Sequence, residues 1–424
     1  GLLYSAFTYF CGFKVNSGEY KLMGLAPYGN PIYVDIIKDN LVDIKEDGSF
    51  RLNDKYFNYS IGLTMTNEAF SSLFKIKPRK TGSKLEQIYM DIAASIQAVL
   101  EEIILKIVTT VSKEHEYENL CLAGGVALNC VANGKILKKK LFKNIWIQPA
   151  SGDAGGALGA AQGFYYEKLN NNRIVNKNDA MKNTYLGPKF DNIKIENDLK
   201  NSKAIYKFYE DDLLIDFTAK QLSEGKIVGW FQDRMEFGPR ALGNRSILGD
   251  PSAKDMQKKL NLKIKFRESF RPFAPMILES KVTDWFEEKI ISPYMLLVDS
   301  LKKEKRFNSE KNADGLEKLN TLRSEVQAIT HVDFSARIQT INEKNNKKIF
   351  KLLNKFNELK NIPILINTSF NVRGEPIVCT PNDAFRCFMG TDMDILVLQN
   401  FILIKNEQTR SDNKQEYINN FNLD

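Results

Sequence analysis

The feature that most constrains the fold is an alternation of short apolar runs with glycine-rich turns from residue 120 onward. An apolar run at 120–123 leads into Gly124-Gly125 and a helix-compatible stretch that ends at Leu137. A second apolar run at 145–148 leads into another glycine-rich turn and a further stretch of small residues. Strand, helix, strand, helix is the order of a parallel α/β layer. The sequence therefore predicts an α/β fold here.

A long helix and a break in composition organise the rest of the first half. Apolar residues recur at helical spacing from 83 to 112, and Ser83 with Glu86 predicts a capping box at the start of this helix. Composition shifts at about residue 168, and the polar run 170–203 predicts a linker with little core of its own. A chain of 424 residues has room for two or three domains.

The second half predicts another α/β unit. Strands are expected at 227–231 and 363–366, and a closing hairpin at 394–405 has Gln399-Asn400 as its turn. Residues 301–325 are highly charged and predict a mobile surface insertion. No segment approaches the roughly 18–20 apolar residues of a membrane span.

The strongest functional signal is an excess of positive charge between Lys226 and Arg271. This stretch holds eleven Lys or Arg and five Asp or Glu, a surplus of +6 in a chain of net charge +8. Arg and Lys bind the oxygens of phosphate and carboxylate groups. Pro239, Pro272 and Pro275 break the chain repeatedly. This suits the wall of a pocket for a small, highly charged anion better than the alternative, an extended nucleic-acid-binding face.

Three segments supply candidate ligands for this anion. The basic segment contributes Arg240, Arg245, Lys265, Arg267 and Arg271. The residues after the strand at 363–366 contribute Asn367, Ser369 and Asn371, and a third segment contributes His331, Ser335 and Arg337. His331 is either a structural hydrogen-bonding residue or a group that orients a phosphate or moves a proton.

A second candidate site lies at the first glycine-rich turns. Gly124 and Gly125 allow backbone N–H groups to approach a phosphate at a helix N-terminus, although glycine pairs at such turns also serve packing. Asn129 and Asn133 lie four residues apart on one helical face. Asp153 is either an N-cap or a ligand of a metal or nucleotide. The loop 16–29, with Glu19 and Lys21, has the composition of a substrate-facing loop or of an ordinary turn.

Composition limits the remaining chemistry. The five cysteines form no C-x-x-C pair, which indicates buried, reduced thiols in a cytoplasmic protein. With only two histidines, the chain cannot build a His-rich metal site by itself. The first residues, beginning at Gly1, read as the middle of a helix without a cap, so we expect the chain to lack a natural N-terminal part.

Seven motifs together resemble one enzyme family and span nearly the whole chain in family order. They are GEYKLMGLAPYG (18–29), LAGGVALNCVANGKI (122–136), SGDAGGALGAA (151–161), WFQDRMEFGPRALGNRSIL (230–248), KFRESFRPFAP (265–275), AITHVDFSARIQT (328–340) and INTSFNVRGEPIVCTP (366–381). The chain resembles the O-carbamoyltransferases of the nodulation-protein and antibiotic-biosynthesis type.

The resemblance implies two domains with different tasks. Residues 1–190 would be a carbamoyl-transfer domain, the second lobe of an actin/sugar-kinase-like fold whose first lobe is largely missing from the chain. Residues 191–424 would be a YrdC-like α/β domain with a mixed twisted sheet. The YrdC-like domain would form carbamoyl-adenylate from carbamoyl phosphate and ATP, with Mg²⁺, and release pyrophosphate. In the transfer domain a hydroxyl of a sugar-like or natural-product acceptor would then attack the carbamoyl carbon.

The resemblance also assigns roles to the candidate residues. Catalytic roles fall on Arg240, Lys265, Arg271 and His331. Binding of carbamoyl phosphate and of the adenylate falls on Arg240, Arg245, Lys265, Arg267, Arg271, Ser335, Arg337, Asn367, Ser369 and Asn371. In the transfer domain, nucleotide binding falls on Gly124, Gly125, Asn129 and Asn133, acceptor contact on Glu19 and Lys21, and the metal, iron or another divalent ion, on Asp153.

The chain departs from the family pattern in three places. The H-x-x-x-H metal ligands of the family would precede residue 1, so we expect full transfer to require the missing N-terminal part. Position 233 is Asp and position 334 is Phe where the family usually has Gly, and both changes would reshape the adenylate pocket or alter a turn. The expected partners are therefore small molecules, and we expect no specific nucleic acid and no membrane partner.

Overall fold

The chain is mixed α/β, as the sequence predicts, and forms two compact units. The computed structural model describes residues 1–175, 179–307, 313–409, 414–419 and 421. The first unit comprises residues 1–148 together with 313–322, and the second comprises 149–307 together with the described residues from 323 onward. The predicted domain boundary at residue 190 is a statement about family domains and stays a prediction.

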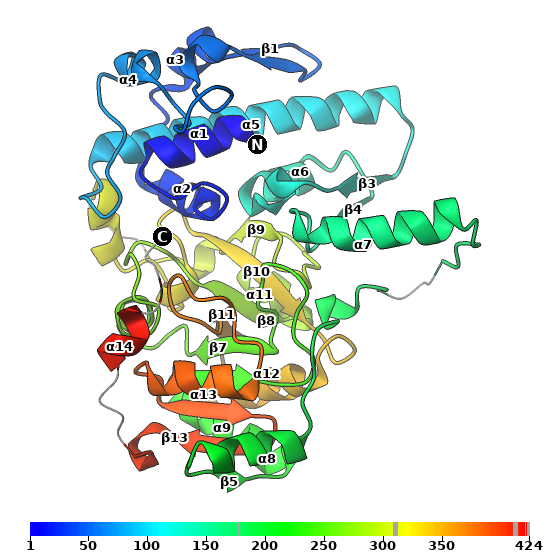
Figure 1. The fold of residues 1–424 in the computed structure, drawn as a ribbon, viewed down its shortest axis with the longest axis vertical. Coiled ribbons are helices and arrows are strands. Elements are labelled where there is room, and N and C mark those ends of the chain that lie inside the picture. Colours follow the sequence, from blue (N-terminus) through cyan, green and yellow to red (C-terminus); the bar gives the residue numbers. More distant parts are fainter. Residues whose placement is uncertain (176–178, 308–312, 410–413, 420, 422–424) are drawn as a thin grey trace. The chain divides into compact units, whose positions relative to one another are not determined.

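The first unit consists of helices with two small sheets (Figure 1). Its elements are α1 (Leu2–Phe10), α2 (Glu19–Leu25), α3 (Val34–Asn40), β1 (Val42–Ile44), β2 (Phe50–Leu52), α4 (Glu68–Phe74), α5 (Gln87–Glu114), β3 (Asn119–Leu122), α6 (Cys130–Lys139) and β4 (Asn144–Ile147). β3 and β4 are parallel, with Cys121 beside Trp146, which confirms the predicted strand–helix–strand order.

The core of the first unit forms between α1, α4 and α5. Phe7 and Phe10 of α1 pack on Phe70 of α4 with ring centroids 5.1 and 4.9 Å apart. The long helix α5 confirms the helical periodicity, but the predicted capping box is wrong. Ser83 Oγ donates to the Lys80 carbonyl, and the helix begins after Glu86 without a side-chain cap.

The second unit is built on a nine-stranded mixed sheet of order β5-β13-β12-β6-β7-β11-β8-β10-β9. The strands are β5 (Lys207–Phe208), β6 (Val228–Phe231), β7 (Arg245–Gly249), β8 (Ala274–Leu278), β9 (Leu297–Ser300), β10 (Ser335–Ile341), β11 (Ile364–Ser369), β12 (Ile395–Leu398) and β13 (Phe401–Ile404). Only the β10–β8 and β12–β6 pairs are parallel, so the predicted mixed sheet is confirmed. The hairpin of β12 and β13 around Gln399-Asn400 is confirmed as well.

The second unit also contains helices, several of which lie against this sheet (Figure 1). The helices of the unit are α7 (Ala154–Gly163), α8 (Asn192–Asn201), α9 (Asp211–Ser223), α10 (Met256–Lys259), α11 (Val282–Trp285), α12 (Lys347–Lys360), α13 (Pro381–Met389) and α14 (Lys414–Asn419). α12 packs against β8 and β11, and α13 packs against β6 and β12. The apolar strands β6 and β12 are entirely buried beneath them.

Two predictions about connecting segments need correction or restriction. The run 170–203 is not a linker throughout, because α8 buries Ile195 and Leu199 in the second unit. In the charged run 301–325, residues 308–312 lie outside the described residues. Its flanks are held in place, since Phe307 N donates to the Arg323 carbonyl at 2.7 Å, so mobility here stays a prediction. No helix of the described chain has the length and hydropathy needed to cross a bilayer.

Candidate functional site

Strand register gathers most predicted anion ligands at one edge of the nine-stranded sheet. Ser369, the last residue of β11, lies opposite Ser246 near the start of β7. Asn367 lies opposite Ala274, the first residue of β8, and so close in sequence to Arg271. β10 runs parallel to β8, so its first residues, including Arg337, start from the same edge. The sheet thus brings together side chains that are far apart in the sequence.

Lys265 lies at the centre of this edge and is almost completely buried. Its Nζ donates to the Ser369 carbonyl at 2.7 Å, to the Asn371 carbonyl at 2.8 Å and to Asn371 Oδ1 at 2.7 Å. Burial, together with the charges of Arg267 and Arg271, lowers the pKa of the Lys265 ammonium well below its ordinary value. Lys265, Ser369 and Asn371, which the sequence predicted separately, are therefore one hydrogen-bonded cluster.

Glu268 joins two arginines beside Lys265. Arg271 lies 3.8 Å from Glu268 Oε2, and Arg373 lies 3.4 Å from Glu268 Oε1. The Arg373 backbone N–H also donates to the Lys265 carbonyl at 3.0 Å. Arg373 was not among the predicted ligands, although it follows Asn371 by two residues in the same motif. Arg373 lies in the turn that follows β11, the strand that ends at the site, and this position could have identified it.

Hydrogen bonds to Glu375 hold the loop that follows Asn371. Glu375 Oε2 accepts from the Val372 N–H at 2.8 Å, and Asn371 Nδ2 donates to the Glu375 carbonyl at 2.6 Å. Tyr417 donates its hydroxyl to the other carboxylate oxygen. Burial raises the pKa of Glu375. The acid therefore fixes the loop that carries Asn371 and Arg373.

Arg245 and Arg267 have partners inside the protein. The Arg245 guanidinium is fully buried 3.5 Å from the centre of the Phe231 ring and donates to backbone carbonyls, including that of Gln232 at 2.6 Å. Burial lowers its pKa to about 10. Arg267 Nε donates to Asn261 Oδ1 at 2.7 Å, and its guanidinium lies 4.8 Å from the Phe273 ring centre. The structure thus gives both side chains a place in the wall of the site.

Glu236 shapes the loop that carries Arg240. Its Oε1 accepts the backbone N–H groups of Leu242 at 2.7 Å and Asn244 at 2.9 Å, and burial raises its pKa. Asn367 Nδ2 donates to the carbonyl of Ala241, the neighbour of Arg240, at 2.9 Å. Arg240 is therefore attached through its neighbour to the same strand end as Ser369.

His331, Ser335 and Arg337 lie together at the start of β10. The His331 N–H donates to the Ser335 carbonyl at 2.9 Å, and His331 Nδ1 accepts from the Val332 N–H at 2.8 Å. This contact makes Nδ1 an acceptor, so the proton of the neutral ring lies on Nε2. Arg337 Nε is buried without a hydrogen-bond partner among the described residues. Phe334 closes this turn with φ 64°, in the left-handed region.

The glycine turn of the first unit has the expected backbone, but its asparagines face inward. Gly124 has φ 94° and is exposed, with open space where a Cβ would lie. Asn129 caps α6 by accepting from the Ala132 N–H at 3.0 Å, and its Nδ2 donates to Gln97 at 3.1 Å. Asn133 donates to the Ala127 carbonyl at 2.8 Å. The two amides hold the turn in shape, and Gly124 with Gly125 present its backbone.

The remaining predicted residues are separate from these clusters. Glu19 Oε1 accepts from Ser5 Oγ at 2.8 Å and from the Asn16 N–H at 2.9 Å, and Lys21 is fully buried. Asp153 is exposed at the start of α7 and caps it without a side-chain hydrogen bond. Across the described part of the chain, no group of three His, Cys, Asp or Glu residues could hold a metal ion. Asp153 alone does not make a complete metal site, and iron or another divalent ion there stays a prediction.

The sequence that builds this site matches two family models and several known proteins. The carbamoyltransferase C-terminus family model matches residues 219–405, and the carbamoyltransferase N-terminus model matches residues 1–162. An uncharacterized protein of Synechocystis sp. is 58% identical over 429 residues, which cover 100% of this chain and 70% of that protein.

Two rhizobial nodulation proteins are also similar. The nodulation protein NolO of Bradyrhizobium diazoefficiens is 36% identical over 398 residues, 93% of this chain and 67% of that protein. The nodulation protein NolNO of Sinorhizobium fredii is 34% identical over 418 residues, 97% of this chain and 56% of that protein. The chain thus spans between 56% and 70% of the length of these three relatives.

Proposed function

The chain belongs to the carbamoyltransferase family, and we propose that its second unit forms carbamoyl-adenylate from carbamoyl phosphate and ATP. We further propose that the carbamoyl group is then transferred to a hydroxyl of a sugar-like or natural-product acceptor. Atoms balance when one water is consumed: carbamoyl phosphate, ATP and water give carbamoyl-adenylate, pyrophosphate and phosphate. Attack of the acceptor hydroxyl on the carbamoyl carbon then releases AMP.

The observation that carries this proposal is the cation cluster around Lys265 and Glu268. Arg271 and Arg373 lie 3.8 and 3.4 Å from the carboxylate of Glu268, beside the buried ammonium of Lys265, so three fixed cations converge in a largely buried setting. Phosphoryl chemistry needs fixed cations where negative charge develops, and such contacts are strongest away from water. Guanidinium groups bind phosphate oxygens in this way, so we assign phosphate binding to Arg271 and Arg373.

The other residues of the site take supporting roles in the proposal. Lys265 fixes Ser369 and Asn371 at the end of β11, so that their polar groups meet the ligand in one geometry. Arg240, Asn367 and Arg337 approach the same edge from three segments and would contact the carbamoyl or nucleotide part. Mg²⁺ would enter bound to ATP, as part of the substrate. His331 orients the turn that precedes Arg337.

Acceptor carbamoylation is proposed for the first unit. Its exposed Gly124-Gly125 turn offers backbone donors for the nucleotide part of the adenylate, next to a helix N-terminus. Glu19 in α2 is the proposed acceptor contact, whereas Lys21 is fully buried and is not proposed as a direct contact. Because Asp153 alone does not make a complete metal site among the described residues, no step is routed through a metal there.

Isotope exchange between ATP and pyrophosphate tests the adenylate step. We expect exchange that requires carbamoyl phosphate, and we expect Arg271→Ala to slow it about 30- to 1,000-fold, the equivalent of about 2–4 kcal/mol for one charge-assisted contact. Arg234→Ala is the matched control, because Arg234 is exposed and makes one carbonyl contact to Gly187. A folded wild-type chain without exchange would contradict the adenylate step. An Arg271→Ala effect of tenfold or less would contradict only the role of Arg271.

A further inference from the structure

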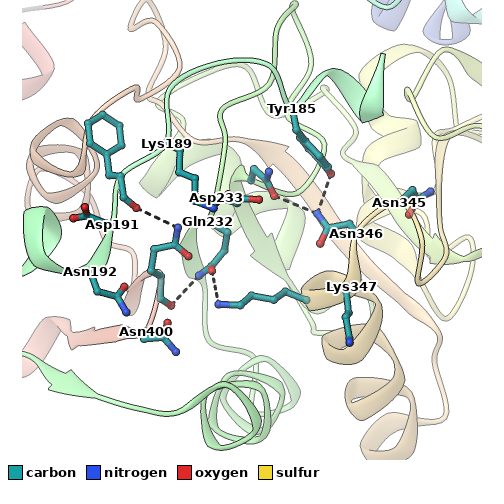
Figure 2. Close-up of a pocket in the computed structure, with 14 residues that line it drawn as sticks. Tyr185, Lys189, Asp191, Asn192, Gln232, Asp233, Asn345, Asn346, Lys347 and Asn400 are labelled. Atoms are coloured by element: carbon teal, nitrogen blue, oxygen red, sulfur yellow. Dashed lines mark hydrogen bonds and ion pairs between the residues drawn. The ribbon is translucent and has the colours of Figure 1, made fainter. Parts of the chain in front are cut away.

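A cavity of about 510 Å³ lies in the second unit, outside the cation cluster (Figure 2). It opens between the end of β6, the β12–β13 turn and the starts of α8 and α12. Lys265, Arg271 and Arg373 do not line it. Its volume falls within the roughly 300–1,000 Å³ of small-molecule sites. The proposed carbamoyl chemistry therefore leaves this cavity without a role.

The lining of the cavity is dominated by side-chain amides. Seven of its fourteen lining residues are Asn or Gln, and Tyr185 and Phe190 add ring surface. An amide offers donors and acceptors on one group, which matches hydroxyls, since a hydroxyl also both donates and accepts. A lining of this kind distinguishes the cavity from the cation cluster, whose side chains are almost all donors.

The charges at the cavity are nearly balanced. The lining includes three lysines, Lys189, Lys347 and Lys348, and two aspartates, Asp191 and Asp233. Lys189 pairs with Asp233 at 2.7 Å, and Lys348 pairs with Asp211 at 3.0 Å. A polyphosphate would lie against the two aspartates of the rim, and like charges in contact oppose binding. The electrostatics thus favour a ligand without net charge.

Several lining amides are held in fixed orientations. Gln232 is buried, donates to the Gln399 carbonyl at 3.0 Å and accepts from Lys348 at 3.2 Å. Asn346 donates to the Tyr185 hydroxyl at 2.9 Å, and Figure 2 shows the two side chains pointing toward each other. Asn346 Nδ2 also donates to Asn244 Oδ1 at 3.2 Å, so this amide retains only acceptor capacity for a ligand, whereas Gln232 retains one donor and one acceptor. Preorganised groups of this kind reduce the entropic cost of binding.

Two residues that line the cavity have a strained backbone, as do other residues elsewhere in the chain. Asp233 and Gln399 have φ values of 33° and 51°, in the left-handed region that side chains other than glycine rarely adopt. Both residues line the cavity, one at the end of β6 and one in the β12–β13 turn. Strained residues persist where the surrounding structure holds them, and they gather at ligand-binding sites.

We propose that this cavity binds a neutral, hydroxyl-rich small molecule of the size of a mono- or disaccharide. Amides would hydrogen-bond the hydroxyls, and the rings of Tyr185 and Phe190 would contact the C–H faces of the sugar. The residues assigned to binding carbamoyl phosphate and the adenylate do not line the cavity, whereas Asp233, a position at which the sequence departs from the family pattern, does.

Saturation-transfer NMR of the full chain with glucose, N-acetylglucosamine and sucrose at millimolar concentration tests the proposal. We expect transfer to the ring protons of at least one sugar, unchanged by added ATP or inorganic phosphate. Asn192→Ala removes a lining amide that makes no hydrogen bond within the described residues, and we expect about tenfold weaker binding, as for the loss of a hydrogen bond in a shielded site. Asn406→Ala, an exposed amide elsewhere in this unit, should bind as the wild type does.

Asp233→Gly gives a second, independent variant. Glycine adopts the backbone conformation of residue 233 without strain, so the chain should remain folded while the carboxylate and its pair with Lys189 are lost. We expect weaker sugar binding here too. The proposal is overturned if no sugar shows transfer, if both variants bind like the wild type, or if phosphate displaces the sugar.

Discussion

Arg245 provides the sharpest test of how the site is built, because the sequence groups it with phosphate ligands and the structure surrounds it with carbonyl oxygens. Its terminal nitrogens donate to the carbonyls of Gln232 at 2.6 Å, Asn244 at 3.1 Å, Pro188 at 3.2 Å and Asp233 at 3.3 Å. We expect Arg245→Ala to destabilise the second unit, with the activity lost only through unfolding.

The magnitude follows from which carbonyls lose their only donor. The Pro188 carbonyl also accepts from Met235 N at 2.9 Å, and the Asn244 carbonyl also accepts from Gln232 N at 2.9 Å. Gln232 and Asp233 have no second donor recorded among the described residues, so two carbonyls are left unsatisfied at about 1–3 kcal/mol each. Loss of the contact with the Phe231 ring adds about 1–2 kcal/mol, and release of a buried charge offsets part of the total. We expect a net loss of about 3–5 kcal/mol.

Urea unfolding followed by tryptophan fluorescence measures this loss, since Trp230 is buried in β6 beside Phe231. Arg234→Ala is the matched control. Arg234 is exposed in the same segment, so its replacement should change the unfolding free energy by less than about 0.5 kcal/mol. Suppose that Arg245→Ala has the same unfolding free energy as the control but has lost carbamoyl-phosphate-dependent exchange. Arg245 would then bind substrate, and the idea that it serves to satisfy backbone carbonyls would be refuted.

Three further outcomes are expected. Phe334→Gly should be about 1 kcal/mol more stable than Phe334→Ala in thermal unfolding, because both lack the ring and only glycine adopts φ 64° freely; equal melting temperatures would contradict this. Because burial raises the pKa of Glu236, the folded chain holds its proton to higher pH than the unfolded chain does. The stability of the wild type relative to Glu236→Gln should therefore fall as pH rises from about 4, and a difference that is constant with pH would be inconsistent. Asn129→Ala should cost about 1–2 kcal/mol through loss of the α6 cap and should lower the melting temperature, whereas a purely nucleotide-binding Asn129 would leave stability unchanged.

Periodicity and turn chemistry in the sequence were sufficient for most of the fold. The long apolar periodicity of α5 and the Gln399-Asn400 turn are local signals, and both elements are present. The capping box at Ser83 failed because its hydroxyl bonds a nearby carbonyl in place of the helix N-terminus. α8 was missed because its two buried apolar residues, Ile195 and Leu199, are few against a polar background. The strand β11 runs three residues beyond the predicted end, since its polar Asn367–Ser369 segment pairs with β7.

The residues of the candidate site could be predicted from the sequence, but which of them bond to one another and which could contact a ligand could not. Motif order identified Lys265, Ser369 and Asn371, yet only the sheet shows that they bond one another. Whether an arginine faces a ligand or a carbonyl depends on backbone groups from distant segments, such as Pro188 beside Arg245. Arg373 was overlooked because it lies outside the basic stretch in the sequence. In the structure it follows the end of β11 and lies close to Glu268.

The charge count of the basic stretch overstates the charge available to a ligand, and this affects what the site can bind. Lys226 and Lys259 both lie near Asp394, outside the stretch, at 3.9 and 3.4 Å. Near Lys265 remain four cations, Lys265, Arg267, Arg271 and Arg373, and two acids, Glu268 and Glu375, and three further arginines, Arg240, Arg245 and Arg337, belong to the same site. A cluster of this size, confined to the ends of a few strands, does not supply the many spread contacts by which proteins hold a long polyanion against salt. It does match a single small phosphate-bearing ligand whose oxygens the neighbouring amides and backbone can orient. We therefore expect a small-molecule phosphoryl site in preference to the nucleic-acid face that the net charge alone allowed.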